Sequence, residues 1–123
     1  MRARRLRGSR NYLAGVAAEH SVASDYERRG YRLARRRWRG TGGEIDLIAR
    51  SGDEVIFVEV KHSRDFARAA ESLCGRQMAR LHAAAAEFLA DEPAGQLTSM
   101  RFDVALVDGT GQLEIIENAF GHG

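Results

Sequence analysis

Asp46, Glu59 and Lys61 are the residues whose types and spacing could support chemistry. Two carboxylates held close together repel each other, and a cation between them relieves that repulsion. Hard divalent ions such as Mg²⁺ or Mn²⁺ prefer carboxylate oxygens and keep water ligands for reaction. A metal held by Asp46 and Glu59 could polarise a phosphodiester oxygen and activate water, while Lys61 orients that water or neutralises growing charge. The three residues therefore predict a metal-dependent phosphodiesterase site.

Lys61 is the only lysine in the chain, beside eighteen arginines. A composition this biased uses arginine wherever arginine will serve. The position that keeps lysine therefore needs a compact ammonium, which a planar guanidinium cannot imitate. The alternative is that a single lysine survived here by chance.

Strand periodicity brings the three residues together. Segments 44–50 and 55–61 alternate as β-strands do, and a short loop joins them. Their apolar faces are expected to pack on one core, with Asp46, Glu59 and Lys61 on the opposite face; these apolar faces comprise Ile45, Leu47 and Ala49, and Ile56, Val58 and Val60. A four-residue loop places Asp46 directly opposite Glu59, about 5 Å apart at Cβ. The alternative is a solvated polar face with a Glu44–Lys61 ion pair.

The other segments predict a mixed β-sheet flanked by helices, of the α/β class. Helices are expected over residues 9–29 and 72–91, and strands over 31–38, 44–50, 55–61, 101–107 and 113–117. The order is therefore αβββαββ. The 123 residues fit one domain, with residues 1–10 as a flexible basic N-terminus. No signal peptide or membrane-spanning run is expected, and the single Cys74 fits a reducing cytoplasm.

Charge is distributed unevenly along the chain. Residues 1–43 hold twelve arginines and three acidic residues, a net +9, whereas residues 44–123 carry a net −7. This asymmetry indicates either contact with a polyanion or a basic terminus that aids solubility. Arg35, Arg36, Arg37 and Arg39 could grip phosphates or protect an edge strand from pairing. The aromatic residues Tyr31 and Trp38 lie in the same basic segment. Each could stack on a base or, alternatively, pack in the core.

The sequence also resembles a known family. Gly43-Glu-Ile-Asp-Leu-Ile-Ala49, followed by Phe57-Val-Glu-Val-Lys61, resembles the PD-(D/E)XK nuclease superfamily. More narrowly, the chain is similar to the YraN-like family of small bacterial proteins (UPF0102), which is related to archaeal Holliday junction resolvases. The resemblance extends over nearly the whole chain, through Gly15 with Glu19, Gly30-Tyr31, Trp38-Arg39, Arg101-Phe-Asp-Val104 and Asn118-Ala-Phe120.

The resemblance implies a restriction-endonuclease-like fold in which Asp46, Glu59 and Lys61 form the catalytic centre with Glu19, a helix-borne acidic partner. It places polar or basic residues at Gln77 and Arg80. The chain departs from the family pattern at Arg37, where asparagine is usual, and at Ser63, where the basic residue comes one place late as Arg64.

Two functions follow as expectations. The first is a Mg²⁺- or Mn²⁺-dependent endonuclease that hydrolyses phosphodiester bonds of DNA, at branched or single-stranded structures, with the metal on Asp46 and Glu59. The alternative is a non-catalytic module that binds nucleic acid in repair, recombination or DNA uptake. Either would contact nucleic acid through Arg35, Arg37, Arg39, Arg64, Gln77 and Arg80. The sequence leaves open whether the protein forms a homodimer.

Overall fold

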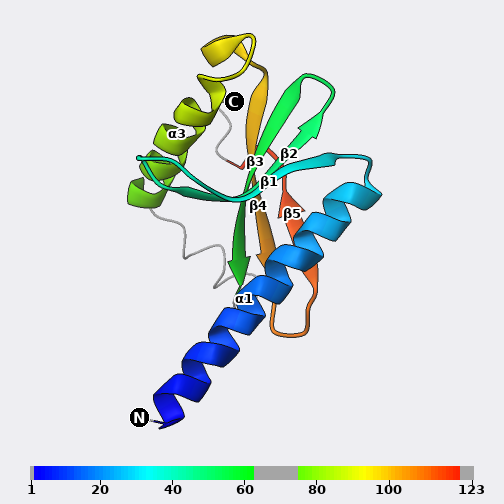
Figure 1. Ribbon diagram of the computed structural model, residues 1–123. Coiled ribbons are helices and arrows are strands. Elements are labelled where there is room, and N and C mark those ends of the chain that lie inside the picture. Colours follow the sequence, from blue (N-terminus) through cyan, green and yellow to red (C-terminus); the bar gives the residue numbers. More distant parts are fainter. Residues whose placement is uncertain (1, 63–74, 120–123) are drawn as a thin grey trace.

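Five strands and two long helices make up most of the described chain (Figure 1). The structure, a computed structural model, describes residues 2–62 and 75–119. In chain order the elements are α1 (Arg2–Arg28), β1 (Arg32–Arg39), β2 (Glu44–Ser51), β3 (Glu54–His62), α3 (Gly75–Leu89), a short 3₁₀ helix η1 (Gly95–Leu97), β4 (Met100–Val107) and β5 (Leu113–Ile116). The described strands lie within two residues of their predicted bounds.

The strands form one sheet in the order β1-β2-β3-β4-β5. Every neighbouring pair is antiparallel except β3 and β4, which run parallel. A parallel pair needs a long crossover, and the connection that contains α3 supplies it. The mixed sheet with flanking helices confirms the predicted α/β class and is consistent with a restriction-endonuclease-like fold.

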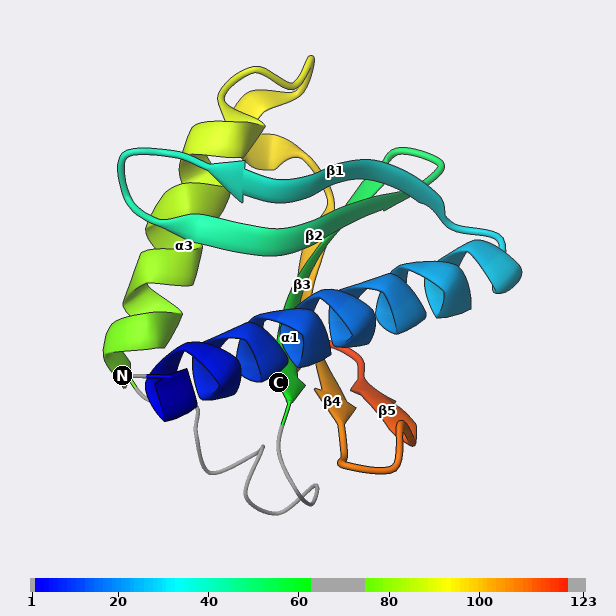
Figure 2. The ribbon, with the colours of Figure 1, turned by 60° about the horizontal axis from the view of Figure 1, so that its bottom comes forward.

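The two helices cover opposite faces of the sheet, α1 on the near side and α3 on the far side in Figure 2. On the α1 face, Val22 and Tyr26 pack against Leu47 and Val58. On the α3 face, Leu81 packs in a second cluster with other buried residues, namely Ile45, Ile48, Val55, Phe57, Ala84, Ala85, Leu89 and Phe102. Both faces are therefore apolar and covered, whereas the sequence predicted one core face and one polar face.

One residue lies on a face that strict alternation does not predict. Ile45 was expected to share a face with Leu47, but it packs in the α3 cluster. Its partner across the ladder, Trp38, packs there too. Arg37 precedes Trp38 and has a left-handed backbone with φ of 49°. This conformation interrupts the pleat of β1, so the paired residues beyond it turn to the other side of the sheet.

The ends of the helices explain how the chain enters the sheet. Gly30 has φ of 96°, and its N–H and that of Tyr31 donate to the carbonyls of Glu27 and Tyr26, both at 3.0 Å. This pattern of bonds closes a helix through a left-handed glycine. At its other end α1 begins at Arg2 rather than at residue 9, because arginine, alanine and leucine are strong helix formers. The flexibility of residues 1–10 stays a prediction.

Candidate functional site

The β2–β3 hairpin brings Asp46 beside Glu59. Arg50 pairs with Val55 and Leu47 pairs with Val58, which confirms the register predicted from the four-residue loop. Regular pairing with β3 ends at Leu47, one residue before the two strands would reach Asp46 and Glu59. Beyond Leu47 the link between the two strands is made by the Asp46 side chain instead of its backbone. The Oδ2 of Asp46 accepts a hydrogen bond from the backbone N–H of Val60 at 2.8 Å.

Glu59 lies at the centre of a set of polar contacts. It is one of only two buried charged residues among those described, at 8% exposure. The Nζ of Lys61 lies 3.5 Å from its Oε1. Gln77, in the first turn of α3, donates from Nε2 to the same oxygen at 3.0 Å. The alternative pair, Glu44 with Lys61, does not form, because Glu44 instead accepts from Arg39 at 3.0 Å. Asp46, Glu59 and Lys61 therefore converge at one point.

The electrostatics of this point favour an added cation or proton. Burial, reinforced by the negative charge of Asp46, raises the pKa of Glu59 to about 8, although Lys61 opposes the shift. Burial also raises the pKa of Asp46, against hydrogen bonds from Val60 and Glu59 that lower it. The side-chain interaction between the two carboxyls lowers the pKa of Asp46 and raises the pKa of Glu59, so a single proton on the pair belongs on Glu59. Without a cation, the pair keeps a proton near neutral pH.

A hollow of about 600 Å³ opens onto the carboxylate pair. Its lining comes from the start of β2, the end of β3 and the first two turns of α3: Gly43, Glu44, Asp46, Glu59, Gln77, Arg80 and Leu81. Gln77 and Arg80 therefore lie where a ligand that reached the carboxylates would meet them. This volume is within the range of sites for small ligands or for part of a polymer.

Glu19 approaches the site from α1, on the other face of the sheet. The negative charge of Glu19 contributes to the raised pKa of Asp46, so the two carboxylates repel each other electrostatically. Arg37 donates to both of its oxygens, from Nε and Nη2, at 2.9–3.2 Å. The left-handed backbone at Arg37 suits asparagine better than other non-glycine residues. This accounts for the asparagine that the family resemblance implies at this position.

The remaining residues that were predicted to contact nucleic acid lie at different places in the structure. Arg80 lines the hollow at the carboxylates, whereas Arg39 does not line it but forms an exposed ion pair with Glu44, which does. Arg35 lines a different hollow, on the same face of the sheet. Arg64 lies outside the described residues. Sequence reasoning missed the backbone N–H of Val60, because a main-chain donor leaves no trace in residue type.

The donor set suits one kind of metal. Among the described residues, no group of three or more histidine, cysteine, aspartate or glutamate side chains could hold an ion. Asp46 and Glu59 offer oxygen atoms only, and each carboxylate has more lone pairs than its present partners use. Mg²⁺ is commonly held by one or two carboxylates, with water and phosphate as further ligands. The pair fits such an ion and does not fit a closed zinc site.

Comparison with known proteins places the chain. Residues 18–107 match the model of the uncharacterised protein family UPF0102. The chain belongs to this family. A UPF0102 protein of Ruegeria pomeroyi is 80% identical over 123 residues, the full length of both chains. One from Cereibacter sphaeroides is 62% identical over 113 residues, 92% of this chain and 97% of the relative. One from Roseobacter denitrificans is 51% identical over 116 residues, 94% of this chain and 90% of the relative.

The segment shared with the UPF0102 family contains the whole candidate centre. It includes Glu19, Asp46, Glu59 and Lys61 and ends at Val107, the last residue of β4. The predicted resemblance to this family is confirmed. Across the described residues, the helices are too short or too polar to span a bilayer.

Proposed function

We propose that this UPF0102 protein hydrolyses phosphodiester bonds of DNA with the help of Mg²⁺ or Mn²⁺. The observation that carries the proposal is the convergence of Asp46, Glu59 and Lys61 at the edge of an open hollow. A buried pair of acids that shares a proton is costly as a purely structural feature. The pair becomes useful where a cation displaces the proton.

Each residue has a separate task in this scheme. Asp46 and Glu59 would hold the metal, which when bound polarises a phosphate oxygen and lowers the pKa of a water molecule. Lys61 places a compact positive charge 3.5 Å from Glu59, where it stabilises the charge that develops on the phosphate. Gln77 keeps the Glu59 side chain in place through its 3.0 Å hydrogen bond. Arg80, in the same hollow, is positioned to contact a neighbouring phosphate.

The proposal is tested by incubating the purified protein with linear, single-stranded and branched DNAs in Mg²⁺, Mn²⁺ or EDTA. Wild type should cut at least one substrate, and only with metal. Both Lys61→Ala and Lys61→Arg should slow cleavage by about a hundredfold or more, because the guanidinium is larger and planar and cannot replace one compact ammonium. Affinity for DNA in EDTA should change little in Lys61→Arg, since the charge is kept.

Arg28→Ala is a matched control. Arg28 is exposed at the C-terminal end of α1, nine residues or about 13 Å along the helix from Glu19. Removing its charge should leave cleavage unchanged. If wild type cuts none of the DNAs in either metal, and crystals soaked in Mn²⁺ hold no ion between Asp46 and Glu59, the enzyme proposal is wrong.

A binding module is the second candidate, and the Glu19–Arg37 pair favours it. An arginine that binds both oxygens of Glu19 occupies a carboxylate that would otherwise face the reactive centre. A module of this kind would bind DNA in EDTA, cut nothing in any metal, and tolerate Lys61→Arg without change. Arg37→Asn tests which role holds, because freeing Glu19 should increase metal-dependent cleavage in an enzyme and leave a module inactive.

A further inference from the structure

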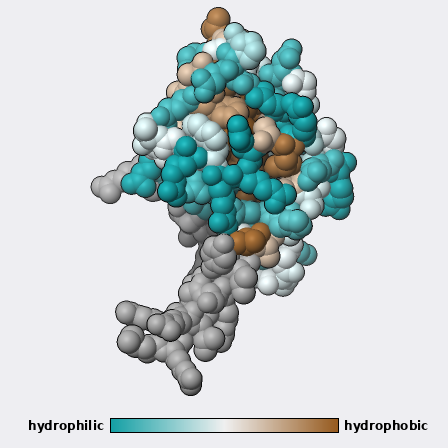
Figure 3. Space-filling view, in the orientation of Figure 1, coloured by the Kyte–Doolittle hydropathy of each residue, from teal (hydrophilic) through white to brown (hydrophobic). Residues whose placement is uncertain are grey.

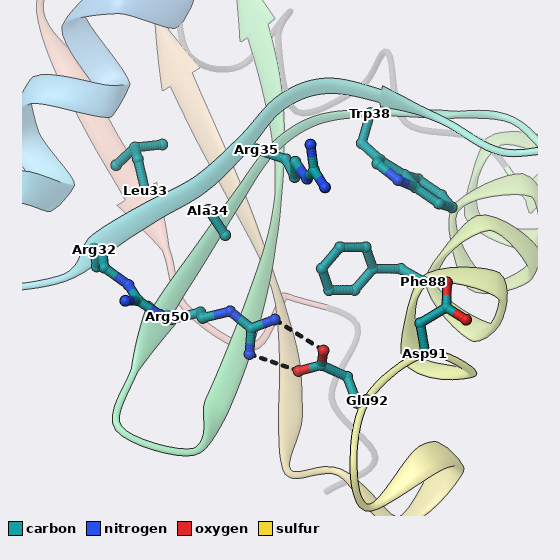
Figure 4. Close-up of a pocket in the computed structure, with 9 residues that line it drawn as sticks. All are labelled: Arg32, Leu33, Ala34, Arg35, Trp38, Arg50, Phe88, Asp91 and Glu92. Carbon is teal, nitrogen blue, oxygen red and sulfur yellow. Dashed lines mark hydrogen bonds and ion pairs between the residues drawn. The ribbon is translucent and has the colours of Figure 1, made fainter.

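A second hollow lies between β1 and the C-terminal half of α3, apart from the carboxylate pair (Figure 4). Its volume is about 480 Å³, and it is lined by Arg32, Leu33, Ala34, Arg35, Trp38, Arg50, Phe88, Asp91 and Glu92. Figure 3 shows apolar side chains between hydrophilic ones on the upper part of the face on view. A partly apolar hollow with a charged rim is the usual form of a ligand site.

Aromatic rings form one wall of this hollow. The rings of Trp38 and Phe88 meet edge to face, with centroids 5.5 Å apart. Both side chains are only half-buried, so part of each ring is open to a ligand. Trp38 comes from β1 and Phe88 from α3, and Figure 4 shows them approaching each other across the hollow. Partly exposed aromatic rings are the groups on which unpaired bases stack.

The charges on the rim are of two kinds. Arg50 is neutralised, because it forms a two-bonded ion pair with Glu92 at 2.5 and 2.9 Å and also lies over the ring of Phe88. Arg32 and Arg35 are exposed, and their side chains make no ion pair or hydrogen bond with the described part of the chain. Asp91 is the only acidic rim residue among those described that is not paired with an arginine. Two guanidinium groups without an ion pair, in one hollow with two aromatic rings, match a base with its flanking phosphates.

The hollow lies on the same face of the sheet as the carboxylate pair, further along α3. Phe88 follows Gln77 by eleven residues, which is about 16 Å of helix. The β1–β2 turn separates the two hollows, since Gly43 lies against Arg80 while Gly40 lies against Glu87 and Trp38. About five nucleotides at duplex spacing cover this distance, and fewer do when the strand is extended. One strand could therefore reach both hollows.

We infer that the hollow between β1 and α3 binds an unstacked base of single-stranded nucleic acid, against Trp38 and Phe88, while Arg32 and Arg35 contact the flanking phosphates. The inference rests on the proposed function and names its substrate class: a single strand, or a branched DNA with a single-stranded arm. A duplex cannot supply this ligand, because its bases are stacked inside the helix.

Trp38 reports on this site directly, since it is the only tryptophan in the chain. Oligothymidylate of twelve nucleotides, titrated in EDTA at low salt, should quench its emission with a saturable curve. A duplex of equal length should not quench it. An oligonucleotide of the same length without bases keeps the phosphates and should bind with little quenching. Equal quenching by the intact and the abasic strand would show that no base enters the hollow.

Arg35 and Arg36 provide a matched pair of variants. They are neighbours on β1, but Arg35 lines the hollow with Trp38, whereas Arg36 lines a hollow beside α1 with Glu19. Arg35→Gln should lower the slope of log affinity against log salt by about 0.7, the value for one phosphate contact with a single strand. Arg36→Gln should leave the quenching of Trp38 and this slope as in wild type. Equal effects of the two changes would overturn the inference.

The outcomes separate this inference from the proposed function. If wild type binds and cuts single-stranded or branched DNA while Trp38 emission and Arg35→Gln show no effect, the base site is wrong and the enzyme stands. If Trp38 is quenched and no DNA is cut in any metal, the base site stands on a binding module. If no single strand binds at low salt, the base site is wrong, and the proposed function is wrong as well only when no DNA of the panel is cut in either metal.

Discussion

At Glu59, burial and a neighbouring negative charge act in the same direction. The side chain is buried, and Asp46 lies beside it, so the ionised form is unfavourable unless a positive charge is near. Lys61 supplies only part of that charge, at 3.5 Å. The residue therefore links protonation, folding and metal binding at a single carboxyl.

The stability of the metal-free protein should fall as the pH rises from about 4.5 to about 8. The pKa of Glu59 is raised from its ordinary 4.5 to about 8 in the folded chain. Over that interval the folded state holds a proton that the unfolded state has released, so unfolding becomes easier with rising pH. Urea unfolding at a series of pH values in EDTA measures the slope. Glu59→Gln cannot ionise and should flatten it, and equal slopes in both proteins would contradict the pKa shift.

At the scale of elements, a buried network ties the C-terminal segment to α1 and β4. Asp103 is fully buried and accepts from Tyr26 at 2.6 Å, from Arg101 at 2.9 Å and from the N–H of Asn118 at 3.0 Å. Burial, reinforced by the bond to Asp103, raises the pKa of Tyr26, which keeps its hydroxyl a donor. Tyr31 accepts from Arg101 at 2.9 Å. These bonds explain why Arg101-Phe-Asp-Val104 and Asn118 occur together.

Asp103→Ala should destabilise the protein by about 3–5 kcal/mol, because it leaves the buried Tyr26 hydroxyl without its acceptor and the half-buried Arg101 without the carboxylate that it binds most closely. Urea denaturation measures the loss. Glu114→Ala on β5 is the control: Glu114 is exposed, and a surface change of this kind stays within about 0.5 kcal/mol. A loss for Asp103→Ala no larger than that of the control would show that the network contributes little.

The β1–β2 turn docks closely on α3. A Cβ built at Gly42 would lie 2.8 Å from the Cβ of Ala83 and 3.3 Å from backbone atoms of Ala83 and Ala84. Glu87 accepts hydrogen bonds from the backbone N–H groups of Thr41 and Gly42 at 3.0 and 2.9 Å. The docked turn therefore fixes the positions of the two hollows relative to each other.

Gly42→Ala should destabilise the protein by about 1–3 kcal/mol through overpacking. Gly15→Ala offers the opposite case. Gly15 lies within α1, and a Cβ there would meet nothing within 4 Å. Alanine at this position should stabilise the helix by about 0.5–1 kcal/mol. Thermal unfolding of the two variants should shift in opposite directions, and a shift in the same direction would contradict the close docking of the turn.

For the whole molecule, local patterns predicted more than long-range contacts. The loop of four residues was sufficient to predict the hairpin register that brings Asp46 beside Glu59, because hairpin register depends only on nearby residues. The face of Ile45 was predicted wrongly, since alternation fails beyond the left-handed Arg37. The hydrogen bond of Gln77 with Glu59 and the ion pair of Arg37 with Glu19 join distant elements. No periodicity in the sequence encodes such contacts.

The order of folding should follow the same division. Val58 pairs with Leu47 within a local hairpin, whereas Val104 pairs with Glu59 across 45 residues. Because closing a long loop costs entropy before contacts repay it, the hairpin should form first. Val58→Ala and Val104→Ala are matched changes at fully buried valines. Stopped-flow kinetics should give a φ-value of about 0.5–0.8 for the first and about 0–0.3 for the second. The reverse order would contradict this pathway.

The single parallel pair also has a consequence during protein synthesis. Met100, the first residue of β4, follows His62, the last of β3, by 38 residues. At about 5–20 residues per second, the ribosome needs about 2–8 s to make that segment. Throughout this time one edge of β3 in the nascent chain, the edge that β4 later occupies, has no neighbouring strand. The strand holds the apolar residues Val55, Phe57 and Val58. An apolar strand with a free edge is where nascent chains associate wrongly, so chaperone demand should peak in this interval and end when β4 leaves the exit tunnel.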